Sequence, residues 1–321
     1  MAELNMVHAI NAALRAEMGR DRDVVVLGED VGADGGVFRA TEGLLAEFGP
    51  ERVVDTPLSE SAIVGMSIGM AAYGLRPVCE IQFMGFIYGA MEQVLTHAAR
   101  IRSRSRGRYS CPLVIRTPYG AGIKAPEIHS ESTEALFCQA PGLKVVAPSD
   151  PYNAKGLLTA AIRDPDPVIF LEPTRLYRLG KAEVPEEDYA LPLGKARVAR
   201  EGDRVTLISW GSMLHQSLRA VEEMEGVEVL DLMTLRPFDE EAVLESVRKT
   251  GRAVVVQEAP RACGLGAEVA AFLAEEAILH LKGPVLRVAG YDAVLPLPRL
   301  EPLYMPSTQR IAKAVEEVLR Y

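Results

Sequence analysis

A carboxylate that follows an apolar pair is the first side chain suited to proton chemistry. Glu60 ends the segment 55–60 (Asp-Thr-Pro-Leu-Ser-Glu), which follows Val53 and Val54 and precedes a long apolar stretch. This order predicts a strand followed by a helix, with Glu60 in the first helical turn, and open α/β sheets bind ligands at that edge. A purely structural interpretation also stands, in which Ser59 caps the helix and Glu60 complements its dipole.

A histidine in a loop rich in glycine and proline is the second candidate. His129 lies in the segment 118–132, directly after the apolar run 113–116. Loops at strand ends carry function disproportionately, and histidine exchanges protons near neutral pH. Taken alone, a histidine in such a loop is more often a hydrogen-bonded structural residue.

An aromatic ring past the end of another apolar run is the third candidate. The run 78–83 contains the polar residues Glu80 and Gln82, and Phe86 follows it. A ring at this place suits contact with a flat ligand, whereas the alternative for an isolated phenylalanine is core packing.

Short Val/Ile-rich runs that alternate with amphipathic stretches must position these side chains. The runs in the first part of the chain are 24–27, 78–83, 113–115, 144–146 and 168–171. They are apolar on both faces, as in central parallel strands, so the alternation predicts a doubly wound, mostly parallel α/β domain. A helix that ends at Gly74 and a C-terminal helix that begins near Ser307 fit the usual capping preferences.

The pattern breaks once, which predicts two domains. Residues 1–178 form the first α/β domain, 179–203 a charged linker with several prolines, and 204–321 a smaller second α/β domain. The stretch 61–74 is rich in small residues, and Gly65 and Gly69 stand four apart. Glycine inside a helix costs about 1 kcal/mol relative to alanine, so we expect another backbone to approach closely, from this chain or a second subunit.

Composition excludes several classes of protein. The net charge of the 321 residues is −9, and only the arginine-rich run 100–108 is basic, so nucleic acid is not an expected partner. The four cysteines form no CxxC pair, and no apolar run has the length of a membrane span. We therefore expect a soluble cytoplasmic protein without a membrane partner, in which Cys79, Cys111 and Cys138 are core residues.

Familiar nucleotide, zinc and hydrolase motifs are missing from the sequence. The Gly-Asp-Gly element that anchors magnesium and diphosphate in thiamine enzymes is also absent. Taken in order, however, several segments resemble the β subunits of thiamine-diphosphate-dependent 2-oxo-acid dehydrogenases. They are 27–32 (LGEDVG), 55–60, 80–83 (EIQF), 129–132 (HSES), 141–146 (PGLKVV), 154–158 (AKGLL), 171–173 (LEP) and 251–259 (GRAVVVQEA).

The resemblance implies a transketolase-like fold, with a pyrimidine-binding domain followed by a transketolase C-terminal-like domain, and a role for each candidate residue. Glu60 would hydrogen-bond N1′ of the thiamine diphosphate aminopyrimidine, and Phe86 would lie against that ring. Leu58 and Gln82 would line the same pocket, and His129 would orient substrate or pass protons during acyl transfer. Many members have tyrosine at the position of Phe86, so a phenolic hydrogen bond is lost here.

The resemblance also implies partners. An α subunit would hold the diphosphate and magnesium in an α2β2 heterotetramer, and the lipoyl-bearing acyltransferase core would dock on the C-terminal domain. Structural potassium is a further implication, bound by carbonyls near Val114 and the segment from Ala161 through Asp164 to Asp166. A plain turn is the alternative for that segment.

The substrate inferred from the resemblance is a small 2-oxo acid. Segments 81–86 and 126–132 are most similar to bacterial pyruvate dehydrogenase β subunits, with branched-chain 2-oxo-acid dehydrogenases close behind and acetoin dehydrogenases third. Two other interpretations remain: a scaffold that mainly docks the acyltransferase core, and a self-contained transketolase-like enzyme, for which the chain is short.

Overall fold

Strands and helices alternate along most of the chain in the computed structural model, which describes residues 1–321. The strands are β1 (Ala2–Leu4), β2 (Val24–Gly28), β3 (Val53–Asp55), β4 (Arg76–Glu80), β5 (Val114–Tyr119), β6 (Lys144–Val146), β7 (Val168–Pro173), β8 (Ala182–Val184), β9 (Arg197–Arg200), β10 (Val205–Ser209), β11 (Val227–Asp231), β12 (Thr234–Arg236), β13 (Ala253–Pro260) and β14 (Leu286–Gly290). The α-helices are α1 (Met6–Arg20), α2 (Leu44–Phe48), α3 (Glu60–Tyr73), α4 (Ile101–Arg104), α5 (Glu134–Cys138), α6 (Pro151–Arg163), α7 (Ser212–Ala220), α8 (Glu240–Thr250), α9 (Leu265–Glu276), α10 (Glu301–Tyr304) and α11 (Thr308–Val318). Shorter or wider turns are η1 (Met84–Ala90), η2 (Glu92–His97, a π-helix), η3 (Ala98–Arg100), η4 (Glu127–His129) and η5 (Thr174–Leu176).

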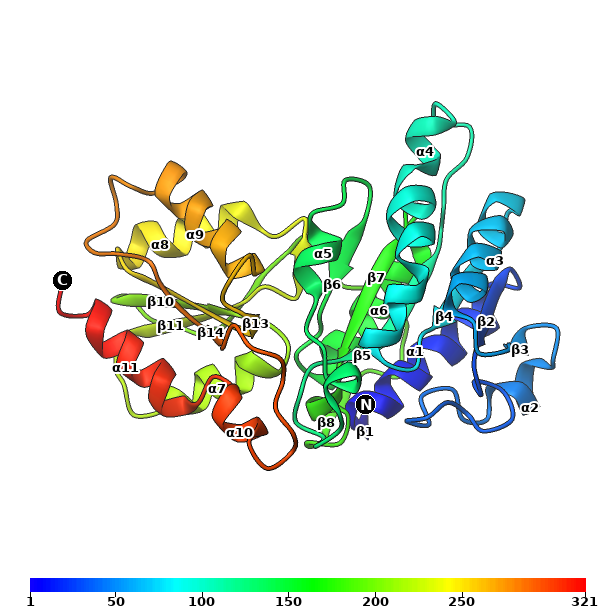
Figure 1. The fold of residues 1–321 in the computed structure, drawn as a ribbon, viewed down its shortest axis with the longest axis horizontal. Coiled ribbons are helices and arrows are strands. Elements are labelled where there is room, and N and C mark those ends of the chain that lie inside the picture. Colours follow the sequence, from blue (N-terminus) through cyan, green and yellow to red (C-terminus); the bar gives the residue numbers. More distant parts are fainter.

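Two sheets covered by helices organise the molecule (Figure 1). The first sheet has the strand order β12-β6-β7-β5-β4-β2-β3 and is parallel except for β12. The second sheet has the order β14-β13-β10-β11-β9 and is parallel except for β9. The predicted α/β architecture with mostly parallel sheets is confirmed.

Strand β2 shows why the apolar runs form buried parallel strands. All its residues are buried. Val24 and Val26 pack with α1 and α6 on one face of the first sheet, whereas Leu27 packs with α3 and η1 on the other. A strand covered on both faces cannot alternate polar and apolar residues, so its run is continuous.

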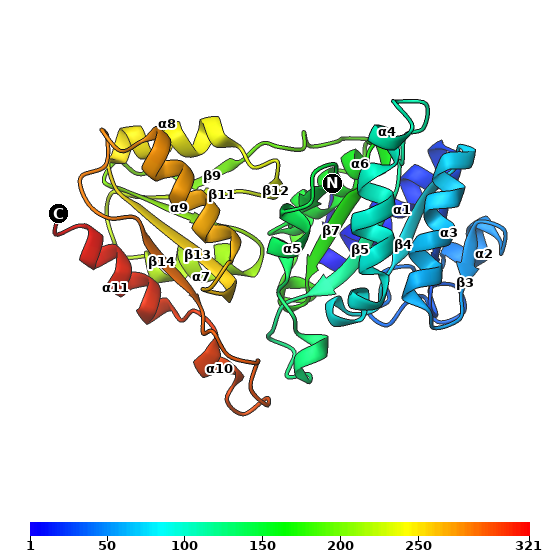
Figure 2. The same ribbon diagram turned by 45° about the horizontal axis from the view of Figure 1, so that its top comes forward.

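The two sheets share one hydrophobic core. A cluster of 37 buried residues includes Tyr119 and Phe137 from the first sheet's side and Trp210 and Phe238 from the second's. Figure 2 shows the two sheets and their covering helices side by side, with α5 between the sheets. The predicted boundaries at residues 178 and 204 stay a prediction.

Two helix ends agree with the sequence patterns. Gly74 caps α3 with a φ of 109°, a left-handed conformation that glycine adopts without steric cost. Ser307 caps α11, since its hydroxyl accepts from the backbone N–H of Arg310 at 3.3 Å.

Three strand features differ from the expected pattern. Strand β4 ends at Glu80 rather than at residue 83, because its neighbour β2 ends at the paired residue Gly28. The segment expected as a linker contains β8, which pairs with β1, and β9, which pairs with β11. Strand β12, from beyond residue 204, adds an antiparallel edge to the first sheet.

Cys79, Cys111 and Cys138 are buried and free, as expected of small core residues, whereas Cys263 is exposed. None of the helices combines the length and the hydropathy that a membrane span requires.

Candidate functional site

Acidic side chains gather where β2, β3 and β4 end. Asp55 closes β3 and accepts hydrogen bonds from the backbone N–H groups of Gly32 at 2.6 Å and Ala33 at 3.0 Å. These bonds fold the segment after β2 over the end of β3. Glu29 begins that segment, and burial raises its pKa, with further contributions from the negative charges of Asp30 and Glu60.

Glu60 is the first residue of α3 and is half-buried. It takes part in no ion pair of the chain. Ser59 precedes it but makes no side-chain capping bond, so the purely structural interpretation of this segment loses its capping residue. Leu58 is 68% exposed and so offers apolar surface at this edge.

A second group of predicted residues meets through aromatic contacts. The ring of His129 packs edge-on against Phe83, with centroids 4.5 Å apart, and against Phe86 at 5.2 Å. The Nδ1 atom of His129 is buried without a hydrogen-bond partner. Phe86 is half-buried in η1, so its ring contacts the histidine and leaves one part accessible.

Close backbone approach brings η1 and η4 together. A Cβ added to Gly85 would lie 2.3 Å from the carbonyl oxygen of Ile128, so only glycine fits there. Tyr88 donates a hydrogen bond to Glu131 at 3.2 Å, which attaches the far end of the loop. These contacts fix His129 against the end of the first sheet.

Gln82 and Phe83 connect the two groups. The Gln82 amide donates to Asp30 at 3.4 Å, on the side of Glu29 and Glu60. The next residue, Phe83, contacts His129. The structure therefore brings Gln82 toward the acidic group and Phe86 toward His129. Glu29, which we did not single out from the sequence, belongs to the first group, and its position directly after a buried strand was the available signal.

A buried ion network lies behind these groups and explains the polar residue in the run 78–83. Arg116 of β5 donates to Glu80 at 2.8 Å and to Glu172 at 2.7 Å and 3.0 Å. Tyr177 donates to Glu172 at 2.6 Å. Burial raises the pKa of Glu80 although Arg116 opposes the shift. The two buried carboxylates thus share one guanidinium, and the Tyr177 hydroxyl gives Glu172 a further donor.

The residues expected near potassium are engaged in other contacts. Asp164 pairs with Lys144 at 2.5 Å, and Asp166 pairs with Arg102 at 2.5 Å. Asp164 also accepts from the backbone N–H of Asp166 at 2.9 Å. Both carboxylates are therefore neutralised by side chains of this chain.

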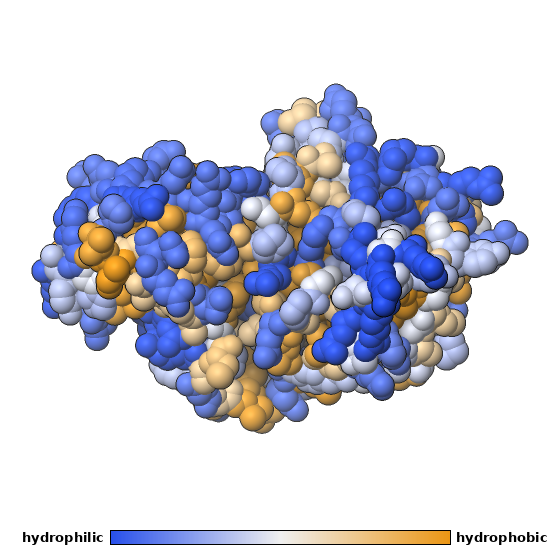
Figure 3. Space-filling model, turned by 90° about the horizontal axis from the view of Figure 1, so that it is seen from above, coloured by the Kyte–Doolittle hydropathy of each residue, from blue (hydrophilic) through white to orange (hydrophobic).

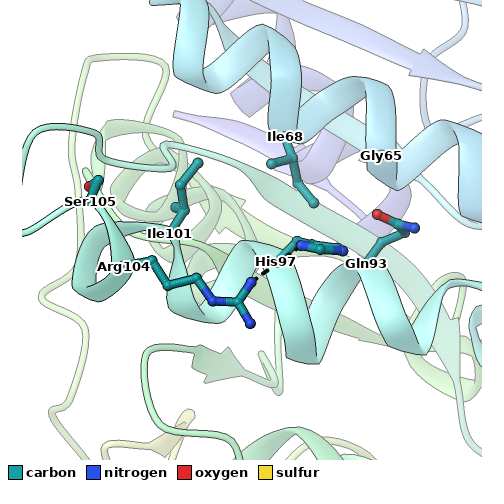
Figure 4. Close-up of a pocket in the computed structure, with 7 residues that line it drawn as sticks. All are labelled: Gly65, Ile68, Gln93, His97, Ile101, Arg104 and Ser105. Atoms are coloured by element: carbon teal, nitrogen blue, oxygen red, sulfur yellow. Dashed lines mark hydrogen bonds between the residues drawn. The ribbon is translucent and has the colours of Figure 1, made fainter.

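Two hollows of the surface lie away from these residues. One of about 540 Å³ opens between α3 and η2 and is lined by residues that include Gly65, Gln93, His97 and Arg104 (Figure 4). A second, of about 530 Å³, lies between α5 and α9. Neither is lined by Leu58, Glu60, Gln82, Phe86 or His129. Near Gly69, an added Cβ would meet open space, so no backbone of this chain approaches it.

Known proteins share this architecture over the full chain. Residues 2–180 match the family described as "Transketolase, pyrimidine binding domain", and residues 194–311 match "Transketolase, C-terminal domain". The chain is 51% identical to the pyruvate dehydrogenase E1 component subunit beta of Staphylococcus epidermidis and 50% identical to that of Bacillus subtilis, covering all of both proteins in each case. A solved split-gene transketolase, in an inactive β4 tetramer, has a TM-score of 0.81 at 25% identity and matches over 99% of both chains.

Proposed function

Because this chain belongs to the pyruvate dehydrogenase E1 β-subunit family, we propose that it supplies one half of a thiamine diphosphate site and works with an α subunit. The reaction is the oxidative decarboxylation of pyruvate, with transfer of the acyl group to lipoyl groups of the acyltransferase core. The observation that carries the proposal is Glu60, a carboxylate without an ionic partner at the carboxyl edge of the first sheet.

The residues at this edge fit the pyrimidine end of the cofactor. Thiamine diphosphate, when bound, supplies the nucleophilic carbon and the electron acceptor for decarboxylation. Glu60 would hydrogen-bond N1′ of the aminopyrimidine, and Glu29 lies close enough for the two carboxylates to interact. Leu58 and Phe86 offer apolar surface to a flat ring, and Gln82 offers an amide.

We place the diphosphate and magnesium on the α subunit, because the sequence has no Gly-Asp-Gly anchoring element. Potassium would be held by backbone carbonyls near Val114 and the segment from Ala161 through Asp164 to Asp166, because the side-chain carboxylates of Asp164 and Asp166 are paired with cations of this chain. No step of the reaction is assigned to it. His129, in contact with Phe83 and Phe86, orients the substrate or passes protons during acyl transfer.

The α partner and the docking of the acyltransferase core on the C-terminal part both belong to this proposal. Hydrophobic side chains, orange in Figure 3, gather at the lower edge of that view, where the loop before α10 projects. Exposed apolar residues of this region are Val294, Leu297, Leu300 and Leu303.

The test uses the chain co-expressed with its α subunit, thiamine diphosphate, magnesium and pyruvate. We expect E60Q to lower kcat by about 10²–10⁴-fold, the usual range for loss of a general acid–base group. E51Q, a change of the same kind at an exposed glutamate just before β3, should leave kcat unchanged. The chain without its α subunit should not turn over.

Wild-type turnover by E60Q would refute the role of Glu60. Turnover by the isolated chain would refute the shared site and favour a self-contained enzyme. A panel of branched-chain 2-oxo acids and acetoin, assayed on the same complex, decides the substrate: faster turnover of either one than of pyruvate would overturn the pyruvate assignment.

A further inference from the structure

Glu258, near the end of β13 in the second sheet, is buried and faces the loop that carries His129. Its Oε1 atom accepts a hydrogen bond from the backbone N–H of Ala121 and one from the Ser132 hydroxyl at 3.3 Å. Its Oε2 atom accepts from the Ser212 hydroxyl at 2.6 Å. All three partners donate, which suits a carboxylate because that group only accepts.

The two loop contacts lie at opposite ends of the same loop. Ala121 stands at its start and Ser132 at its end, and between them the backbone N–H of Gly120 donates to the carbonyl of Glu131 at 2.9 Å. One carboxylate oxygen therefore closes the base of the loop 120–132. His129 lies within the closed segment.

The fit around this carboxylate is tight. Gly120 has a φ of +85°, and a Cβ there would lie 2.6 Å from Oε1 of Glu258. The carbonyl of Gly120 also accepts from the Thr174 hydroxyl at 3.0 Å, which fixes the peptide from the first sheet's side. The loop is thus held by η1 on one side and by Glu258 on the other.

We propose that Glu258 is a positioning residue for the reaction: it closes the loop 120–132 from the second sheet and thereby sets the place of His129. The role in catalysis depends on the proposed function, whereas the closure of the loop does not. A change in the angle between the sheets would move His129 through this contact.

Hydrogen exchange of the full-length chain tests the closure directly. Loss of a hydrogen bond to a buried charged group changes the equilibrium constant for local opening by about tenfold or more. In E258A the amides of Gly120 and Ala121 should therefore exchange at least about ten times faster. E258Q should restore most of the protection, because its amide oxygen still accepts from Ala121. The matched control is E228A, a buried glutamate of β11 whose partners are Ser246 and Lys249; the loop amides should be unaffected by it.

Unchanged exchange of Gly120 and Ala121 in E258A would overturn the proposal. Should E258A not fold, S132A removes a single donor to the same oxygen. Faster exchange of the two amides in S132A supports the closure, and unchanged exchange overturns it.

A double-mutant cycle in the complex with the α subunit tests the link to His129. If Glu258 acts through His129, kcat of E258A/H129A should equal that of H129A within about twofold, since coupled residues are not additive. Independent, multiplied losses would overturn the positioning role. An inactive wild-type complex would instead refute the proposed function, and the exchange experiment would still decide the closure of the loop.

Discussion

Two glutamates that each begin a helix show how surroundings separate the behaviour of the same side chain. Glu60 is half-buried and free of ionic partners at the edge of the first sheet. Glu134 begins α5, is fully buried between the two sheets, and accepts from the Trp210 indole at 3.3 Å, while its Oε2 atom has no partner. Burial raises the pKa of Glu134 to about 7, and the nearby Glu258 adds to the shift.

The shift at Glu134 predicts a pH-dependent stability. The folded protein holds the proton more tightly than the unfolded chain, so the free energy of unfolding falls as pH rises from the unfolded pKa near 4.5 to the folded value of about 7. Ionisation above that pH costs on the order of 3 kcal/mol, at 1.36 kcal/mol for each pKa unit. We expect E134Q, which cannot ionise, to gain stability relative to wild type by that order between pH 5 and pH 8.

Urea unfolding of both proteins across this pH range provides the measurement. Replacing the carboxyl group with an amide changes the free energy of unfolding of E134Q by the same amount at every pH. The other acidic groups titrate in both proteins, so they do not contribute to the difference. A difference between the two proteins that stays constant from pH 5 to pH 8 would show that Glu134 does not titrate in this window.

The sequence pointed to some of the site residues but not to the buried residues that hold them in place. Glu60 and His129 were visible because each follows an apolar run in a recognisable place. Glu258 lies in segment 251–259, which carries part of the family resemblance. Nothing in the sequence pointed to its contact with the loop, because its partner Ala121 is 137 positions away. Glu134 gave no signal, because its burial depends on Trp210 of the other sheet.

At the scale of elements, the contact between η1 and η4 fixes the loop of His129. Replacing Gly85 with alanine would place a Cβ 2.3 Å from the backbone oxygen of Ile128 and 2.5 Å from its Cγ1 atom. Backbone cannot move aside cheaply, so we expect G85A to lose about 1–3 kcal/mol of stability, as overpacked sites do. Amides of segment 126–129 should also exchange faster.

Gly89 is the matched control for Gly85. It lies in the same element, η1, and an added Cβ there would meet no atom within 4 Å. G89A should remain within about 0.5 kcal/mol of wild type, as surface substitutions do. Equal effects of G85A and G89A on the melting temperature would show that η4 does not depend on this close approach.

The elements themselves were largely predictable where local signals decided them. The helix α3 ends at the predicted Gly74, and α11 begins after the predicted cap Ser307. The end of β4 was not predictable, because it depends on where β2 stops. Strand β12 was not predictable either, since three residues acquire strand structure only by pairing with β6, about 90 positions earlier.

At the scale of the whole molecule, the two sheets are joined by more than a surface contact. One core of 37 residues extends across both, and β12 pairs with β6 by backbone hydrogen bonds. The Nε2–H group of His215 donates a hydrogen bond to the carbonyl of Ser149 at 2.6 Å, and Arg197 pairs with Asp150 at 2.9 Å. Separating the sheets would expose this core and leave buried polar groups without partners.

This shared core predicts that the chain unfolds as one unit. Trp210 is the only tryptophan and lies between the sheets with 1% of its surface exposed, so its fluorescence reports their separation. Far-UV circular dichroism reports both sheets together. Chains of this length with two sheets often unfold in steps, yet we expect the two urea transitions to have the same midpoint, because the sheets cannot part without breaking the common core.

W210F supplies the baseline for tyrosine emission in that experiment. A fluorescence transition at lower urea than the circular dichroism transition would mean that the sheets part while each remains folded. The hydrogen bonds from the loop 120–132 to Glu258 would then break before either sheet unfolds. Coincident transitions mean instead that the position of His129 and the relative placement of the sheets are maintained together until the whole chain unfolds.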